Sequence, residues 1–424
     1  MRPRLPVHQI RQSLASFNWS AAYRAIYDTV CGGATLIMVS FALALGIEKE
    51  QIGWITSAVS FACLLQMLGP TLASAVPDRK SFVLRLGYAE PLLMMAAVAA
   101  LPWLPQAARI PVLAAAVFMA AASIQLTRPI TEDWVATVLP AGLRGRYLGR
   151  RLQLASLFGI AAILASGFLA QAASKTNPLG LAAILVGGGV FGLMSVAVLR
   201  RATMPDAMAR ARFTWAGFRQ VFTERPFRRL MLAVAIYNLP FFFACPYYQV
   251  YYLRILNMKE SCVAWMMVGY TVIKALTSTA AGRWVDRVGA RRAILVCGPL
   301  YAVFFVSFPF ATPQCPWPVI IAWTLVGLGD AAWNVAYTAS VYAAIPPGPS
   351  RPMFFAVASL LMVGAFGVGA ILAIPLLRAL EPLRLTLFGQ PLTHFHILYA
   401  LCAAVMLPGS LAGLLFPSQR KPKA

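Results

Sequence analysis

Long apolar runs, each long enough to cross a lipid bilayer, divide this sequence from end to end. A transmembrane helix needs about 20 mostly apolar residues. Soluble domains carry about 25% charged residues, whereas this chain is 60% hydrophobic and only 12% charged. The sequence therefore predicts an all-α membrane protein with twelve transmembrane spans, which we place at residues 19–45, 53–75, 82–104, 109–139, 150–173, 178–199, 229–254, 261–281, 292–312, 317–345, 352–377 and 393–416.

One connector between the spans differs from the others. Residues 200–228 are long, polar and rich in Arg, and they separate the first six spans from the last six. We predict an N-terminal six-helix bundle at 1–199, a cytoplasmic linker at 200–228 and a C-terminal six-helix bundle at 229–424. Within the linker, Ala207 to Arg219 has the pattern of an amphipathic helix that lies on the membrane surface.

The charge of the chain is strongly positive and unevenly distributed. Its 36 Lys and Arg against 13 Asp and Glu leave a formal charge of +23, which in a soluble protein would favour nucleic-acid binding. Cytoplasmic loops of membrane proteins also collect Lys and Arg. With the N-terminus inside, 26 basic residues fall on the inner side and 7 on the outer side. We therefore predict no nucleic-acid partner, a cell (inner) membrane location and two cytoplasmic termini.

The two halves of the sequence repeat one another. The charge-dense segment Gly282–Arg292, GRWVDRVGARR, forms a predicted turn between two apolar runs, and a shorter version, PDRK at 77–80, occurs 208 positions earlier. AIYD at 25–28 likewise matches AIYN at 235–238. Because each half has an even number of spans, both copies have the same topology. Parallel repeats of this kind are typical of transporters that work by alternating access.

These loop segments resemble those of the major facilitator superfamily. GRWVDRVGARR is similar to that superfamily's G-x-L-x-D-R-x-G-R-R loop, and RGRYLGRR at 144–151 is similar to the 4–5 loop of many bacterial members. Span 5 lacks the Gly-Pro motif of the family's drug/proton antiporters. The resemblance implies two pseudo-symmetric bundles, with spans 1, 4, 7 and 10 around a central cavity.

The resemblance also implies a cytoplasmic gate built from the charged loops. In that gate Asp78 would meet Arg144 or Arg146, and Asp286 would meet Arg351. The expected gate residues are Asp78, Arg79, Arg144, Arg146, Gly282, Asp286, Arg287 and Arg351.

Ionisable residues inside spans indicate function because burying them in hydrocarbon is costly. Asp28 lies one turn after Arg24, so the two either form a local ion pair or leave a carboxylate free to bind a proton or a cationic group. Arg128 precedes Pro129, which favours a helix kink. Its guanidinium either clamps a carboxylate or phosphate or pairs with Asp28 or Asp330.

A second group of candidates lies in spans 8 and 10. Asp330 and Asn334 share a helix face bordered by Trp333, which favours a small-molecule site. The alternative is a buried polar network between helices. Lys274 either neutralises Asp28 or Asp330 or binds an anionic substrate. For Glu90, in span 3, we favour a structural role near the cytoplasmic end.

Span 7 supplies aromatic and amide side chains. Tyr237 and Asn238 lie deep enough to reach a cavity, whereas the tyrosines at 247–252 are expected in the outer interfacial belt. His394 and His396 do not share a helix face, and the seven Cys lack metal-binding spacing, so no metal is expected. The predicted substrate-binding or proton-binding residues are Arg24, Tyr27, Asp28, Arg128, Tyr237, Asn238, Lys274, Asp330, Trp333 and Asn334.

The sequence therefore predicts a secondary transporter that moves a small solute by alternating access and is coupled to protons through Asp28 or Asp330. The alternatives are an exporter of amphipathic drugs or lipids and a non-transporting membrane receptor. The motifs of metalloproteases, serine hydrolases and nucleotide-binding enzymes are missing from the sequence. We expect no enzymatic activity and no cofactor. The expected partners are a small-molecule substrate, protons and the lipid bilayer, and we expect a monomer.

Overall fold

The computed structural model describes residues 6–32, 35–47, 59, 61–172, 177–205, 215–248, 251–258, 260–346, 348, 350–383, 385–387 and 390–416. Eight helical segments of this part of the chain are long and apolar enough to cross a membrane. They are Arg79–Trp103, Gln106–Val138, Ala141–Leu169, Pro178–Leu199, Arg225–Ala244, Ala290–Phe310, Trp317–Ala344 and His394–Leu415. Residues 53–58 and 60 of the predicted second span, and residues 207–214 of the predicted amphipathic helix, lie outside the described residues.

The chain forms two compact units. Unit 1 comprises Met1–Pro140, Leu154–Phe222 and Pro347–Val357, and unit 2 comprises Ala141–Gln153, Thr223–Pro346 and Ala358–Ala424. The start of α7 (Arg144–Ala172) thus belongs to unit 2, and the start of α16 (Arg351–Leu380) belongs to unit 1. The division of the chain into 1–199, 200–228 and 229–424 stays a prediction.

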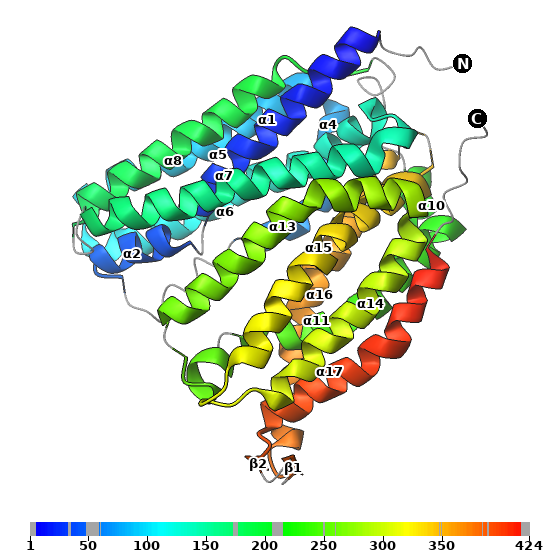
Figure 1. Cartoon of the computed structure of the whole chain (residues 1–424). Helices are drawn as coiled ribbons and strands as arrows, with labels where there is room; N and C mark the ends of the chain where they lie inside the picture. The colour runs from blue at the N-terminus through cyan, green and yellow to red at the C-terminus, as the bar shows by residue number, and fades with distance from the viewer. Residues whose placement is uncertain are drawn as a thin grey trace. The chain divides into compact units, whose positions relative to one another are not determined.

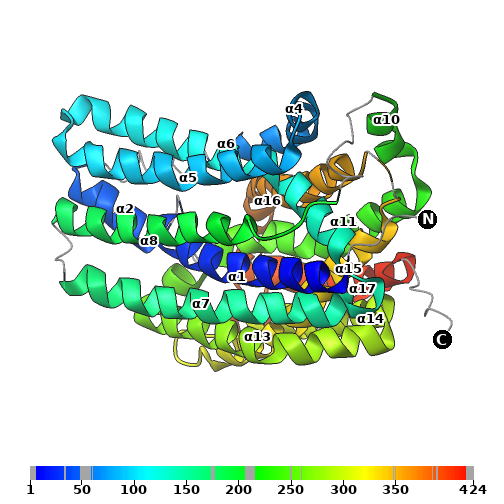
Figure 2. The same cartoon turned by 90° about the horizontal axis from the view of Figure 1, so that it is seen from above.

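Unit 1 is built from helices of the first half of the chain. In Figures 1 and 2, α1 and α8 run side by side, and α5 lies beside α6. Besides most of α7, its helices are α1 (Val7–Cys31), α2 (Leu36–Ala44), the 3-10 helix η1 (Cys63–Met67), α4 (Gly69–Ala75), α5 (Arg79–Ala100), the 3-10 helix η2 (Leu101–Trp103), α6 (Gln106–Val138), α8 (Pro178–Leu199) and α10 (Trp215–Thr223).

Unit 2 is built from helices of the second half. In it, α15 packs against both α13 and α14, and α14 packs against α17 (Figure 1). Besides most of α16, its helices are the 3-10 helix η3 (Ala141–Leu143), α11 (Arg225–Ala244), the 3-10 helix η4 (Cys245–Tyr247), the π-helix η5 (Tyr251–Ile255), α13 (Glu260–Val288), α14 (Ala290–Ser307), the 3-10 helix η6 (Phe308–Phe310), α15 (Trp317–Ala344), α17 (His394–Ser410) and the 3-10 helix η7 (Leu411–Leu415). Strands β1 (Thr386–Leu387) and β2 (Gln390–Pro391) pair antiparallel.

The first predicted span, 19–45, is interrupted. Helix α1 ends at Cys31, and α2 begins at Leu36 after Thr35, whose hydroxyl accepts a hydrogen bond from the Met38 backbone N–H. A β-carbon at Gly32 would lie 2.6 Å from the Asp28 carbonyl oxygen. The backbone can take this path at the end of α1 because Gly32 has no side chain.

The segment Gly282–Arg292, predicted as a turn, is almost entirely helical. Helix α13 continues to Val288 and α14 starts at Ala290, so only Gly289 reverses the chain, with φ of +87°. Such a φ favours glycine because a β-carbon is strained there. The prediction of a turn was wrong because charged residues mark where water meets the chain and do not mark where a helix stops.

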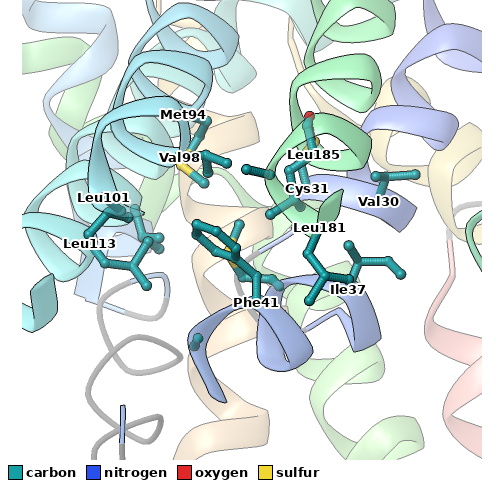
Figure 3. Close-up of a cluster of buried hydrophobic side chains, with 14 of the residues drawn as sticks. Val30, Cys31, Ile37, Phe41, Met94, Val98, Leu101, Leu113, Leu181 and Leu185 are labelled. Carbon is teal, nitrogen blue, oxygen red and sulfur yellow. Dashed lines mark hydrogen bonds between the residues drawn. The ribbon is translucent and has the colours of Figure 1, made fainter. Parts of the chain in front are cut away.

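An apolar core fills one end of unit 1, where α2 packs against α8 and where residues of α5, η2 and α6 join them (Figure 3). Phe41, Leu101, Leu113 and Leu181 are all fully buried there. The thiol of Cys31 donates a hydrogen bond to the Leu185 carbonyl, 3.1 Å away. Since lipid tails are as apolar as these side chains, close packing is what holds such helices together in a membrane.

An aromatic core fills one end of unit 2. Tyr251 and Tyr252 are 0% exposed. The Tyr251 hydroxyl donates to the Phe308 carbonyl at 2.8 Å and lies 3.0 Å from His396 Nε2. The expectation of an interfacial tyrosine belt was therefore wrong for these residues. Their hydroxyls have partners inside the unit, so they do not need the membrane surface.

Candidate ion-pair sites in the two units

Three charged side chains meet in unit 1. Arg24 Nε lies 2.7 Å from Asp28 Oδ1, and the same guanidinium binds both oxygens of Glu90, with Nη2 at 2.7 Å from Oε1. The Glu90 side chain is 5% exposed, whereas that of Asp28 is 55% exposed. The guanidinium also lies 5.0 Å from the ring centroid of Tyr27, which is buried. One cation is thus shared between an accessible and a buried carboxylate.

Sequence reasoning left Glu90 out of the candidate site. The structure places its carboxylate on Arg24, in a bidentate pair that fixes the guanidinium plane. A signal was available, because a Glu in a span is as costly as an Asp. The partner was not foreseeable, since Glu90 and Arg24 are 66 positions apart.

Unit 2 holds a second charged cluster around one carboxylate. Lys274 Nζ on α13 lies 2.5 Å from Asp330 Oδ2 on α15, and both side chains are about one-fifth exposed, at 18% and 21%. The Tyr270 hydroxyl donates to Asp330 Oδ2 at 2.5 Å, and the Tyr301 hydroxyl donates to Oδ1 at 3.3 Å. Of the partners considered for Lys274, the structure selects Asp330. Sequence reasoning missed both tyrosines, although Tyr270 shares a helix face with Lys274.

An aromatic pair borders this cluster. The rings of Tyr237 and Trp333 are stacked, with centroids 4.2 Å apart and an interplanar angle of 2°. Both residues are buried, and the Tyr237 ring also meets the Tyr301 ring edge-on at 6.1 Å. The stack therefore links two predicted site residues, through Tyr301, to the Asp330 carboxylate.

The two Asn side chains predicted for the site donate hydrogen bonds to backbone carbonyls of their own helices. Asn238 Nδ2 donates to the Val234 carbonyl at 2.8 Å, and Asn334 Nδ2 donates to the Asp330 carbonyl at 2.8 Å. Asn238 is buried and Asn334 is partly buried. Arg128 on α6 is exposed and precedes Pro129, which lies inside a continuous helix.

The carboxylate of Asp286 caps the start of α7 within unit 2. Its Oδ1 accepts the Gly145 backbone N–H and its Oδ2 accepts the Arg146 N–H, each at 2.7 Å. A carboxylate at a helix N-terminus is favoured by the helix dipole. Gly282, one turn earlier on α13, would place a β-carbon 2.2 Å from the Gly145 carbonyl oxygen. The resemblance assigned this segment to Asp78, and the structure places Asp286 there.

A charged cluster in unit 1 holds the start of α16. Arg351 Nη1 lies 3.1 Å from Asp133 Oδ1 and donates to Thr137 Oγ1 at 2.6 Å. Both charged side chains are at least nine-tenths buried. Arg79, also buried, lies within electrostatic reach of Asp133. The resemblance assigned Arg351 to Asp286, whereas its partners here are Asp133 and Thr137.

Asp78 has a local role. Its side chain accepts the Lys80 backbone N–H at 2.9 Å and the Ser81 hydroxyl at 2.7 Å, and it caps α5. The hydrogen bond from Ser81 lowers the pKa of the Asp78 carboxyl below its ordinary value. Arg287 stands exposed in the last turn of α13, where a cation is favoured by the helix dipole.

Comparisons with known proteins agree with this architecture. Residues 230–424 match the family model described as Major Facilitator Superfamily. The E. coli fucose:proton symporter FucP superposes with a TM-score of 0.70 at 14% identity, covering 95% of this chain and 98% of that one. Among curated proteins, no sequence matches this chain.

Two further solved structures share the fold. The proton:xylose symporter XylE has a TM-score of 0.68 at 12% identity, with 95% of each chain covered. The human organic anion transporter TETRAN has a TM-score of 0.66 at 12% identity, covering 96% of this chain and 100% of that one.

The fold thus defines a multi-pass membrane protein of the twelve-helix, two-bundle class. Within that class, residues 230–424 match the model of the major facilitator superfamily, and the whole chain shares the fold of solved members. The resemblance drawn from the loop segments is therefore confirmed at the level of the family.

Proposed function

We propose that this protein is a proton-coupled secondary transporter that moves a small organic anion or zwitterion by alternating access. The observation that carries the proposal is the Lys274–Asp330 pair, because it joins a cation and a carboxylate inside apolar helices without fully burying them. A carboxylate that is partly accessible inside a span can exchange protons, and intramembrane ionisable residues are typical of proton relays.

The chemistry of coupling follows from the contacts. When Asp330 is ionised, it attracts Lys274 and accepts hydrogen bonds from Tyr270 and Tyr301. When Asp330 takes up a proton, the Coulomb attraction ends and the ammonium group of Lys274 becomes available to a solute carboxylate. The solute and the proton would then travel together, and loss of the proton would restore the pair and release the solute.

The Arg24 cluster offers a second point of coupling. Asp28 is the accessible member, and protonation of Asp28 would leave Arg24 held by Glu90 alone. The aromatic stack of Tyr237 and Trp333 would supply an apolar wall beside Asp330. We also propose a polar role in solute binding for Asn238 and Asn334 in unit 2 and, separately, for Arg128 in unit 1.

The proposal extends to the gate and to the orientation. The Asp286–α7 and Asp133–Arg351 contacts would form a cytoplasmic latch, together with Asp78, Arg79 and the basic loop at 144–151. The excess of basic residues in the connecting loops supports cytoplasmic termini in the cell membrane. We propose a monomeric carrier without cofactor.

Solved structures with the same fold support testing proton coupling first. Two of them are proton symporters, for fucose and for xylose, and another is an organic anion transporter. Purified protein would be screened by thermal shift against organic anions, amino acids and sugars, because a ligand that binds the native state raises Tm. Hits would then be assayed as uptake into proteoliposomes with and without an inward-directed proton gradient.

The outcome separates coupled from uncoupled transport. We expect uptake to follow the proton gradient and Asp330→Asn to abolish that dependence while exchange of solute persists. Gradient-independent uptake that is unchanged in both Asp28→Asn and Asp330→Asn would refute proton coupling. Binding without any counterflow would identify a receptor instead of a carrier.

A further inference from the structure

Helix α10 (Trp215–Thr223) presents an aromatic and cationic face that no transport step described above uses. Trp215 is 75% exposed and Phe222 is 54% exposed, and Arg219 is exposed between them. At spacings of four and seven residues the three side chains share one face of the helix. Phe218 steadies the two rings, with edge-on contacts at 6.0 Å to Trp215 and 5.3 Å to Phe222.

The other side of α10 is attached to unit 1. Val221 is 2% exposed. The side-chain oxygen Oε1 of Gln220 accepts a hydrogen bond from the Ser350 hydroxyl at 3.1 Å. Ser350 immediately precedes Arg351, which binds Asp133 and Thr137. The face of α10 that carries Trp215 and Phe222 is therefore exposed, whereas Gln220, on the opposite side, contacts the residue before α16.

The position of α10 in the chain places it at a membrane surface. It lies in the connection between α8 and α11, and both of those helices are long and apolar enough to cross a membrane. Exposed Trp rings favour the interfacial region, and an Arg beside them reaches the headgroups. Residues 200–229 contain eight Arg against Asp206 and Glu224. A strongly basic segment of this kind attracts anionic lipid.

We propose that the face of α10 formed by Trp215, Arg219 and Phe222 binds an anionic phospholipid, and that Gln220 transmits this binding to the start of α16. The two rings enter the acyl boundary, and the guanidinium of Arg219 holds the phosphodiester. A seated lipid fixes α10, and α10 fixes Ser350 next to the Arg351–Asp133 pair. Anionic lipid thereby stabilises the closed arrangement of that pair.

The test measures lipid binding and its transmission separately, and neither measurement needs the transported solute. Purified full-length protein in detergent would receive dioleoyl phosphatidylglycerol, dioleoyl phosphatidylcholine or inorganic phosphate. Tm would be recorded, together with amide hydrogen exchange of residues 351–357. We expect phosphatidylglycerol to raise Tm and slow that exchange more than phosphatidylcholine does, and phosphate alone to do neither.

Four variants decide the mechanism. Arg219→Gln should lower the Tm increment specific to phosphatidylglycerol at least about twofold, and Arg219→Lys should restore most of it. Arg11→Gln, which removes an equal charge from an exposed site on α1, should leave it unchanged. Gln220→Ala should keep the lipid bound, as measured by native mass spectrometry, and lose the slowed exchange at 351–357.

Three results would overturn the proposal. They are equal effects of the two lipids on the native protein, an effect of Arg11→Gln as large as that of Arg219→Gln, or a response to inorganic phosphate alone. Retention of the slowed exchange in Gln220→Ala would refute the transmission step.

Discussion

Lys274 Nζ lies 2.5 Å from Asp330 Oδ2, and the Tyr270 hydroxyl donates to the same carboxylate oxygen. The two charged residues come from different helices, α13 and α15, which are separated in the chain by all of α14. The pair therefore links these helices, and it places an ammonium group where a solute carboxylate could take over its partner.

Breaking this pair on one side should destabilise the protein. Asp330→Asn leaves the Lys274 charge without its counter-ion, at an expected cost of about 2 kcal/mol, less than the 3–5 kcal/mol typical of fully buried pairs because both groups keep some exposure. Tm in detergent measures the effect. The double variant Lys274→Gln/Asp330→Asn should recover most of the lost stability, and simple addition of the two single effects would contradict a direct ion pair.

The two carboxylates on Arg24 should differ in importance for stability. Glu90 is buried and bidentate, whereas Asp28 is half exposed. We expect Glu90→Gln to lower stability by about 2–3 kcal/mol and Asp28→Asn by less than about 1 kcal/mol. Thermal melts of the two variants, each conservative in shape, provide the comparison. An equal loss in both would show that burial does not set the strength of these contacts.

Asp286→Asn should impair transport more than Asp78→Asn. Asp286 accepts two backbone N–H groups at the start of α7, so Asn loses one hydrogen bond and the charge at the helix N-terminus, about 1–2 kcal/mol together. Asp78 accepts hydrogen bonds from Lys80 and Ser81, two and three positions along the chain, and so holds its own helix. Initial uptake rates in proteoliposomes, normalised to inserted protein, test the order. The reverse order would place the main latch at Asp78.

Gly282→Ala should be poorly tolerated. Its β-carbon would meet the Gly145 carbonyl oxygen at 2.2 Å and the Gly149 Cα at 3.3 Å, which forces α13 and α7 apart. Gly187 on α8 serves as the control, because a β-carbon added there would have no atom within 4 Å. Gly187→Ala should be neutral or stabilise by about 0.5–1 kcal/mol. Matching Tm values for the two variants would exclude the close helix contact.

Much of the fold followed from the sequence because the bilayer acts on each segment separately. The length of an apolar run is a local property, and so is the cost of a charge such as Asp330 within it. The loop GRWVDRVGARR likewise identified the family that residues 230–424 match. The break in the first span at Gly32 escaped prediction, because an apolar run looks alike whether or not its backbone continues as one helix.

The partners of the charges were decided by tertiary structure alone. Arg24 meets Glu90 across 66 positions, and Arg351 meets Thr137 across 214. No local pattern encodes such a meeting, because it depends on which helix faces are brought together. The burial of Tyr251 shows the same limit, since a tyrosine near a span end suits either an interface or a core that satisfies its hydroxyl. The sequence by itself therefore determined which residues need partners, and the packing of helices decided which partners they have.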